Sequence, residues 1–188
     1  MKKVTLLGDS IRQIGYGTKV PEMLGEEYKV FQPEDNCRFV KYTLRMLFDF
    51  REQMEGSDVI HWNNGLWDIP TGLFEDDEPF TDMEEYIKNM LRVAKELKRL
   101  GKRVIFATTT PVNPEHEYND NSIIKAYNDA IVPKLQAMGI EINDLYSLVA
   151  QDIDKYICED KIHLSVEGIE LCAKQVVQVI KGDSNLMF

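Results

Sequence analysis

The sequence predicts an α/β fold in which helices cover both faces of a parallel sheet. Along the 188 residues, short apolar runs typical of buried strands alternate with segments of helical periodicity. A helix between two strands lets them lie parallel in one sheet, so this alternation favours a parallel sheet over a set of hairpins. No repeat or linker interrupts the pattern and the length suits one domain, so we expect residues 1–188 to form a single domain.

Three strands are expected in the first third of the chain. Residues 4–7 form a short apolar run, and residues 28–31 form another that ends before Pro33. Residues 39–54 carry apolar side chains at helical spacing, and residues 58–62 return to a strand pattern. In a parallel sheet these strands end at the same edge, so the loops that follow them should lie close together.

The clearest helix begins after an acidic loop. Thr81 and Glu84 have the spacing of a capping box, and apolar side chains then recur at helical spacing as far as Gly101, a candidate C-cap. Beyond it we expect a strand at 103–108, a helix at 122–138 disturbed by Pro133, a short strand at 140–142, a short helix capped by Asp144 and a last helix capped by Ser165.

Charge and composition argue against several classes of partner. The formal net charge is −10, and such a surface repels the phosphates of nucleic acids and anionic lipids, so we expect neither nucleic-acid nor membrane binding. No apolar stretch approaches the roughly 20 residues that cross a bilayer, and the N-terminal run is too short for a secretion signal. Cys37, Cys158 and Cys172 are an odd number without a C-x-x-C pair, which is typical of reduced thiols. We therefore expect a cytoplasmic protein.

The first predicted strand leads into Gly8-Asp9-Ser10. A serine on the turn that leaves a buried strand is exposed at the carboxyl edge of the sheet, where the reacting groups of α/β proteins gather. Its hydroxyl becomes a nucleophile only when a neighbouring base takes the proton. The alternative is that Ser10 caps the next helix, because a motif this short occurs often by chance.

Asp160 and His163 provide a candidate base at the other end of the chain. An aspartate three residues before a histidine in a tight loop can accept the Nδ1–H and leave Nε2 to face a hydroxyl. The alternative is an incidental hydrogen bond at a helix entry. His61 lies inside a predicted strand and His116 in a charged segment that we expect to be solvated, so His163 is the histidine that comes with a spaced carboxylate.

These motifs resemble the signature blocks of the SGNH, or GDSL-type, hydrolases. G-D-S and D-x-x-H-L are similar to the first and last blocks, and residues 58–68 and 108–112 stand where intermediate segments fall, so the resemblance covers almost the whole chain. It implies a flavodoxin-like, three-layer α/β/α sandwich with about five parallel strands. It also implies Ser10 as nucleophile, His163 as general base and then acid, and Asp160 as the residue that orients it. No organic cofactor is implied, and no cluster of ligand residues argues for a metal.

Two blocks depart from the family pattern. An ungapped fit puts Cys37 where the family has a glycine whose backbone N–H joins the oxyanion hole, and a backbone donor needs no particular side chain. In the third block Trp67 stands where an asparagine is expected, and a subgroup with N-x-G-L-x-D looks similar. We expect Asn63 to supply the amide donor beside the backbone N–H of Ser10, with Asn64 as the runner-up; the alternative is that both asparagines satisfy the turn backbone.

Other polar and aromatic residues near the nucleophile are candidate substrate contacts. Arg12 and Tyr16 follow Ser10 and either line a polar pocket or pack the helix entry. Asn64 and Trp67 are placed at the border of the pocket, although a tryptophan beside a strand is more often core. The acidic run at residues 75–78 is expected to be solvated.

The expected function is serine-dependent hydrolysis of carboxylic esters through an acyl-enzyme. We see no lid-like apolar segment, which with the family resemblance favours small acyl groups, such as acetyl, on a carbohydrate or another polar alcohol. The alternatives are a lysophospholipase-like acylhydrolase or an acyltransferase on the same residues and, from another class, a non-catalytic flavodoxin-like binding module. That module would need a run of backbone donors after the first strand, and it leaves Asp160 and His163 unexplained.

Overall fold

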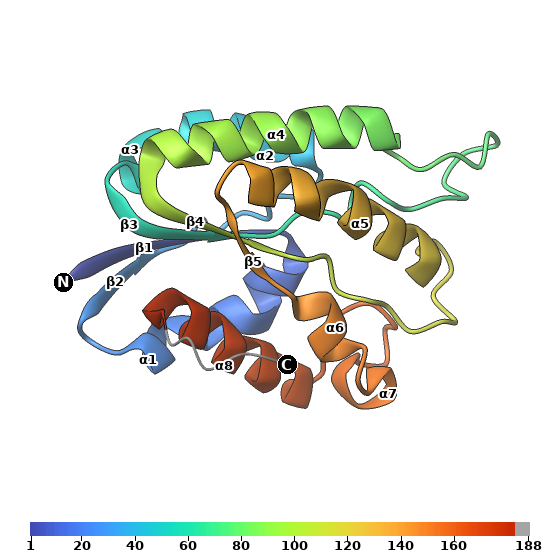
Figure 1. Ribbon diagram of the computed structural model, residues 1–188. Helices are drawn as coiled ribbons and strands as arrows, with labels where there is room; N and C mark the ends of the chain where they lie inside the picture. Colours follow the sequence, from blue (N-terminus) through green and yellow to red (C-terminus); the bar gives the residue numbers. More distant parts are fainter. Residues whose placement is uncertain (183–188) are drawn as a thin grey trace.

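Residues 1–182 are described by the computed structural model shown in Figure 1. In this part of the chain five parallel strands form one sheet, in the order β2-β1-β3-β4-β5. β1 pairs with both β2 and β3, so it lies inside the sheet, and Val4, Leu6 and Leu7 are fully buried. The strands are Lys2–Leu7 (β1), Tyr28–Phe31 (β2), Ser57–Trp62 (β3), Gly101–Ala107 (β4) and Glu141–Asn143 (β5).

Helices cover both faces of the sheet, as the sequence predicts. Figure 1 shows α2, α4 and α5 on one face, and α1 and α8 with the short α6 and α7 on the other. α2 packs against α4 and α4 against α5, while α1 and α6 pack against α8. This is the predicted three-layer α/β/α sandwich. The helices are Val20–Leu24 (α1), Val40–Asp49 (α2), Arg51–Met54 (α3), Met83–Leu100 (α4), Asn121–Ala137 (α5), Leu145–Val149 (α6), Ile153–Tyr156 (α7) and Val166–Lys181 (α8).

The strands end together at one edge of the sheet. Leu7 lies beside Trp62, and Trp62 lies beside Phe106, so β1, β3 and β4 reach this edge in register. Because the strands are parallel, the segments that follow them all leave the sheet here. A turn of π-helix at Ile11–Gly15 follows β1 and leads toward α1. Residues from distant parts of the sequence therefore meet at the carboxyl edge.

Three helices differ from the prediction, and one of them, α5, begins at Asn121 and runs through Pro133 to Ala137 without the expected disturbance. The helix expected over residues 39–54 is interrupted at Phe50, whose φ of −109° and ψ of 20° are not helical, so α2 and α3 are separate. Asp82 rather than Thr81 caps α4, and its carboxylate accepts a hydrogen bond from the backbone N–H of Glu85 at 2.8 Å. Aspartate competes well for this position because its side chain reaches the free N–H groups of the first turn.

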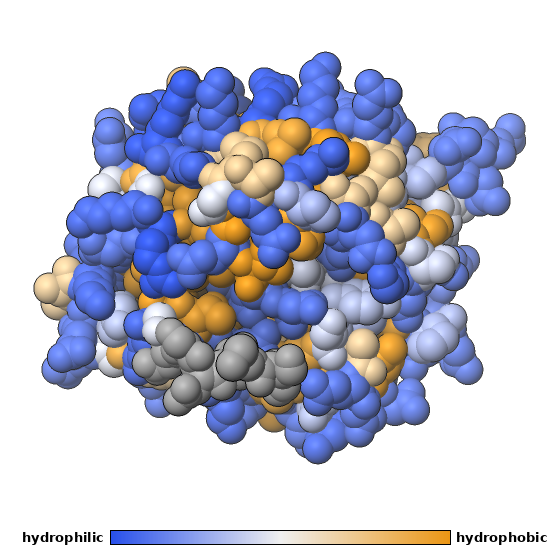
Figure 2. All heavy atoms as spheres, viewed as in Figure 1, coloured by the Kyte–Doolittle hydropathy of each residue, from blue (hydrophilic) through white to orange (hydrophobic). Residues whose placement is uncertain are grey.

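The face seen in Figure 2 is largely hydrophilic, with hydrophobic side chains in patches between hydrophilic ones. Within residues 1–182, none of the helices has the length and apolar character needed to cross a membrane.

Candidate active site

A serine, a histidine and an aspartate contact one another at the carboxyl edge of the sheet. The Oγ of Ser10 lies 2.8 Å from Nε2 of His163, and Nδ1 of that ring lies 2.6 Å from Oδ2 of Asp160. Ser10 comes shortly after β1 and His163 shortly before α8, so the fold joins residues 153 positions apart. These three predicted residues form the hydrogen-bonded chain that activation of a serine hydroxyl requires.

The loop around Asp160 fixes both the charge and the orientation of its carboxylate. Oδ1 accepts hydrogen bonds from the backbone N–H groups of Ile162 and His163 at 3.0 and 2.9 Å, and from the thiol of Cys158 at 3.1 Å. Partial burial raises the pKa of Asp160, but these bonds and the one from the His163 ring hold that pKa well below its usual range. An ionised carboxylate can only accept, so it selects the ring tautomer with a proton on Nδ1 and leaves Nε2 free to accept from Ser10.

The other two histidines have different environments. His61 is buried in β3, its Nε2 lies 3.0 Å from the amide nitrogen of Asn143, and burial lowers its pKa to about 3. It is a neutral side chain of the core, within the strand that the sequence predicts. The expectation that His116 is simply solvated is wrong: its Nδ1 accepts from the backbone N–H groups of Tyr118 and Asn119 at 3.2 and 3.1 Å, and the ring lines the cleft beside Ser10.

Of the two backbone donors predicted for an oxyanion hole, one is free. The N–H of Ser10 has no hydrogen-bond acceptor among residues 1–182. The N–H of Cys37 donates to the carbonyl of Gly8 at 3.1 Å, and Sγ of Cys37 accepts from the N–H of Gly8 at 3.2 Å. The placement of Cys37 in the oxyanion hole is therefore wrong, because its N–H already holds the loop after β2 against the nucleophile turn.

Asn63 lies directly behind that turn. Its Nδ2 donates to Oδ1 of Asp9 at 2.8 Å, and its Oδ1 accepts from the hydroxyl of Tyr16 at 2.8 Å. A side chain at Gly8 would not fit, since a Cβ there would lie 1.9 Å from Oδ1 of Asn63. Burial raises the pKa of both Asp9 and Tyr16, so Tyr16 stays a neutral donor. These two hydrogen bonds fix the orientation of the Asn63 amide. One of the two N–H groups of Nδ2 has no acceptor among the described residues, and the side chain lies in a residue that is 4% exposed.

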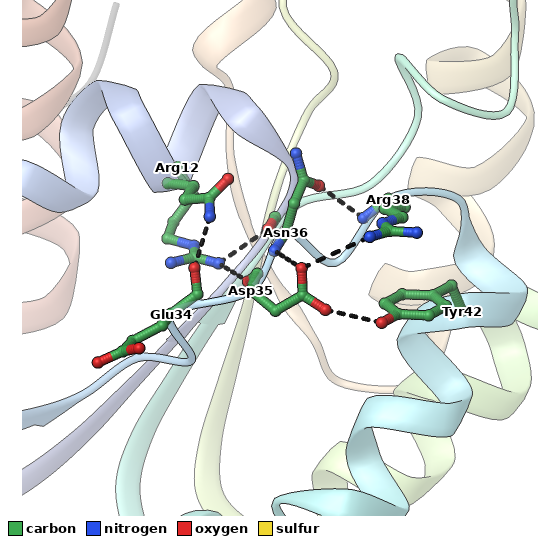
Figure 3. Close-up of polar contacts among 8 residues, drawn as sticks. Arg12, Glu34, Asp35, Asn36, Arg38 and Tyr42 are labelled. Atoms are coloured by element: carbon green, nitrogen blue, oxygen red, sulfur yellow. Dashed lines mark hydrogen bonds and ion pairs between the residues drawn. The ribbon is translucent and has the colours of Figure 1, made fainter.

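Arg12 holds loops together instead of facing the solvent. It is 2% exposed, and its guanidinium donates to three backbone carbonyls of the nucleophile turn and the loop after β2, at 2.9, 3.2 and 2.9 Å. Figure 3 shows Arg12 reaching the segment that carries Asp35, whose carboxylate contacts Arg38 and Tyr42 at the start of α2. The prediction that Arg12 and Tyr16 line a polar substrate pocket is wrong, because both side chains are buried and committed to internal hydrogen bonds.

A cleft of about 620 Å³ opens beside Ser10 and His163. Trp67, predicted as a wall of the pocket, lines it and is 44% exposed. Most of the lining is not predicted by the sequence, because the apolar residues around the acidic run 75–78 follow neither a helical nor a strand period. We call Phe39, Leu66, Trp67, Leu73 and Phe80 the apolar wall; the remaining lining residues are Gln13, Ile14, Pro70, His116, Tyr118, Asn119 and Ile162.

Solved structures with this fold include several ester hydrolases. The lipase/acylhydrolase from Enterococcus faecalis superposes with a TM-score of 0.77 at 20% identity and covers 97% of each chain. Axe2, an acetylxylan esterase from Geobacillus stearothermophilus, superposes with a TM-score of 0.77 at 17% identity, over 95% of this chain and 94% of its own. At these identities the likeness shows a shared fold.

Sequence comparison identifies the relatives more closely, although no family model matches the chain. Over 118 residues, 55% of this chain, it is 31% identical to the GDSL esterase/lipase CPRD49 of Arabidopsis thaliana and 29% identical to the GDSL esterase/lipase WDL1 of Oryza sativa subsp. japonica. The chain is thus similar in sequence to GDSL esterases/lipases over about half its length. It spans about half the length of these curated relatives, 46% and 45% respectively.

Two residues of the segment compared with the third family block have separate roles in this chain. Asn64 is buried: its Nδ2 donates to the carbonyl of Arg38 at 2.9 Å, and its Oδ1 accepts from the hydroxyl of Thr43 at 3.1 Å and the indole N–H of Trp62 at 3.0 Å. The prediction that Asn64 contacts substrate is therefore wrong, because the side chain joins β3 to the loop before α2. Trp67, at the position of the family asparagine, faces the cleft.

Proposed function

We propose that the protein hydrolyses carboxylic esters through an acyl-enzyme formed on Ser10. The observation that carries this proposal is the contact of 2.8 Å between the Ser10 hydroxyl and a histidine whose other nitrogen is held by an ionised aspartate. A serine that merely capped a helix would need no such partner. The similarity to a GDSL esterase/lipase and the cleft beside Ser10 support the same conclusion.

The proposed reaction has two halves. Oγ of Ser10 bonds to the ester carbonyl carbon while Nε2 of His163 takes the hydroxyl proton, and Asp160 stabilises the resulting imidazolium. The tetrahedral intermediate then releases the alcohol, as His163 returns the proton to the leaving oxygen. In the second half, water attacks the acyl-enzyme with the same proton transfers, which frees the acid and restores Ser10.

In the proposal, two donors stabilise the oxyanion of the tetrahedral intermediate. One is the free backbone N–H of Ser10. The other is the unassigned N–H of the Asn63 amide, which Asp9 and Tyr16 hold in place. Donors that are already oriented need no reorganisation when charge develops on the substrate oxygen, which makes such groups effective.

Two kinds of ester are candidate substrates. Small acyl esters of a carbohydrate or another polar alcohol are the first candidate, and an acetylxylan esterase shares this fold. The apolar lining of the cleft favours instead the acylhydrolase alternative, in which a larger apolar group occupies the cleft. An acyltransferase would use the same residues with an alcohol in place of water.

We place the protein in the cytoplasm, since its three cysteines are unpaired within the described residues.

The rival of another class, a non-catalytic phosphate-binding module, is not favoured by the turn after β1. Apart from the N–H of Ser10, its backbone donors are already engaged: the N–H of Ile11 donates to the Asp9 side chain, and those of Arg12 and Gln13 donate to the Asp9 carbonyl. A phosphate would also meet the buried carboxylate of Asp9 at this turn. Anion binding needs free N–H groups without a nearby negative charge.

The test is hydrolysis of p-nitrophenyl butyrate by Ser10→Ala and His163→Ala, with Ser122→Ala at the start of α5 as the control. Members of such a triad act as a unit, so each of the first two substitutions should lower kcat by about 10³-fold or more with an unchanged melting temperature. The control should match the wild type. Turnover by purified Ser10→Ala at a comparable rate would exclude Ser10 as the nucleophile.

A further inference from the structure

Exposed hydrophobic side chains gather at the cleft. Of the nine large hydrophobic residues that are exposed within residues 1–182, five line it, namely Ile14, Trp67, Leu73, Phe80 and Tyr118. On a chain with net charge −10 this concentration beside Ser10 and His163 is not the scattered exposure normal for a protein surface. It indicates that something apolar binds here.

The apolar wall is built into the fold. Its Phe39 ring comes from the loop before α2 and its Phe80 ring from the end of the connection between β3 and α4, and the two ring centroids lie 5.5 Å apart. Both oxygens of the buried Asp68 accept from the backbone N–H of Val40, at 3.1 and 3.0 Å, which ties the two connections together. The N–H of Phe80 also donates to the carbonyl of Pro70 at 2.9 Å. The wall is therefore preformed, as binding surfaces for small molecules usually are.

The chemistry of the site decides which part of an ester meets this wall. His163 returns its proton to the leaving alcohol, so the alcohol must lie on the histidine's side of Ser10. His163 belongs to the loop before α8, whereas the wall belongs to connections that lead into α2 and α4 on the opposite face of the sheet (Figure 1). The acyl group points away from the leaving oxygen and hence toward the wall.

We propose that the apolar wall binds the acyl group and that the protein prefers esters of uncharged, apolar acids of roughly four to eight carbons over acetates. This inference rests on the proposed function, since it assigns the acyl side from the roles of Ser10 and His163. The acidic run at 75–78 lies in the same connection, between Leu73 and Phe80, and would repel an acyl group that carried a negative charge. The cleft of about 620 Å³ is larger than an acetyl group needs.

The experiment measures kcat/KM along two ester series. In p-nitrophenyl acetate, butyrate, hexanoate and octanoate only the acyl group grows, and each buried methylene should raise kcat/KM about fourfold, or ~0.8 kcal/mol, giving on the order of 10²-fold from acetate to hexanoate. In the second series the acyl group stays acetyl, while the alcohol part of the ester is ethanol, hexanol or xylose. A rise with the alcohol and not with the acyl chain would overturn the assignment, as would a preference for acetate.

Variants of the wall make the test specific. Trp67→Ser and Leu73→Ser should each lower kcat/KM on the hexanoate severalfold more than on the acetate, so that the acyl-length dependence becomes weaker. The control is Phe48→Ser, which removes an exposed aromatic ring of α2 that does not line the cleft. A length dependence that is the same in all four proteins would overturn the proposal. If activity depends on Ser10 but prefers acetate, only this inference fails; if no ester is hydrolysed in a Ser10-dependent way, the proposed function fails first.

Discussion

Two regions border the nucleophile, and they place their polar and apolar residues in opposite ways. Behind Ser10, the residues Asp9, Arg12, Tyr16 and Asn63 form what we call the polar floor, and all are buried. Their hydrogen bonds run to one another and to backbone carbonyls. In front of Ser10, the apolar wall leaves Trp67, Leu73 and Phe80 exposed to solvent. The buried polar groups of the floor thus serve the fold, whereas the side chains of the wall face the cleft.

The difference follows from the cost of burying polar groups. A buried amide, hydroxyl or guanidinium needs internal partners, and a turn that follows directly from a buried strand is itself buried. The floor therefore directs most of its hydrogen bonds to partners inside the fold, and Asn63 keeps one amide N–H for a ligand. Apolar side chains exposed on a loop have the reverse problem, since only a ligand or partner removes them from water. Polar residues near a nucleophile are for this reason poor indicators of substrate contacts.

The largest effect of the substitutions below is expected from Asp160→Asn. Asp160 belongs neither to the polar floor nor to the apolar wall, so this variant tests the triad alone. The amide would favour the tautomer with the proton on Nε2, so kcat should fall about 10³- to 10⁴-fold with little change in KM. The measurement is steady-state hydrolysis of p-nitrophenyl butyrate, with the exposed Asp154→Asn of α7 as the control. Near-normal kcat in Asp160→Asn would mean that this carboxylate does not orient the base.

Asn63→Ala tests whether a residue of the polar floor donates a hydrogen bond to the substrate. Loss of one oriented donor should lower kcat about 10²- to 10³-fold and change KM little. Asn64→Ala is the matched control, because its amide bonds only within the fold and its loss should lower the melting temperature with a small effect on kcat. A kcat defect confined to Asn64→Ala, at unchanged stability, would move the donor to Asn64.

Arg12→Met tests the claim that the floor is structural. Three backbone carbonyls would each lose a hydrogen bond, at about 1 kcal/mol each, so we expect the free energy of unfolding to drop by about 3 kcal/mol in urea titrations. Arg38→Met, at a half-exposed side chain, should cost under about 1 kcal/mol. If Arg12→Met instead raised KM at normal stability, Arg12 would be a substrate contact after all.

The smallest effect concerns Asp68, which anchors the wall. Burial raises the pKa of Asp68 to about 7 in the folded protein, above its unfolded value of 3.8. A raised pKa contributes stability that is fully present below about pH 4 and is lost as pH rises through about 7, where the buried carboxyl must ionise. The melting temperature of the wild type should therefore fall between about pH 5 and pH 8 by more than that of Asp68→Asn. Parallel curves for the two proteins would show that Asp68 does not titrate in this range.

The sequence predicts the fold and the triad well because both depend on local patterns. The alternation of apolar runs with helical periods defines the parallel sheet, and Ser165 caps α8 as predicted, with the N–H of Gly168 donating to its Oγ at 3.0 Å. Asp160 and His163 are three residues apart, so their contact is local, and only the placement of Ser10 beside them needs the tertiary structure.

What the sequence does not predict depends on contacts between distant loops. Nothing near Cys37 in sequence shows that its N–H meets the carbonyl of Gly8, since that bond joins the loop after β2 to the turn after β1. The apolar wall combines Phe39 with side chains more than 25 positions away, without a period that would place them on one face. Likewise, no proline or glycine at this point of the sequence indicates that the predicted helix is interrupted at Phe50.

The most direct test of Ser10 as the nucleophile is labelling with a serine-reactive p-nitrophenyl phosphonate that carries an apolar chain, followed by intact-mass analysis and peptide mapping. We expect one adduct per wild-type chain, located on Ser10, and no adduct on Ser10→Ala. Labelling of His163→Ala should be much slower, because the hydroxyl then lacks its base. Labelling of Ser10→Ala at the wild-type rate, or an adduct mapped to another residue, would contradict the claim that Ser10 is the nucleophile.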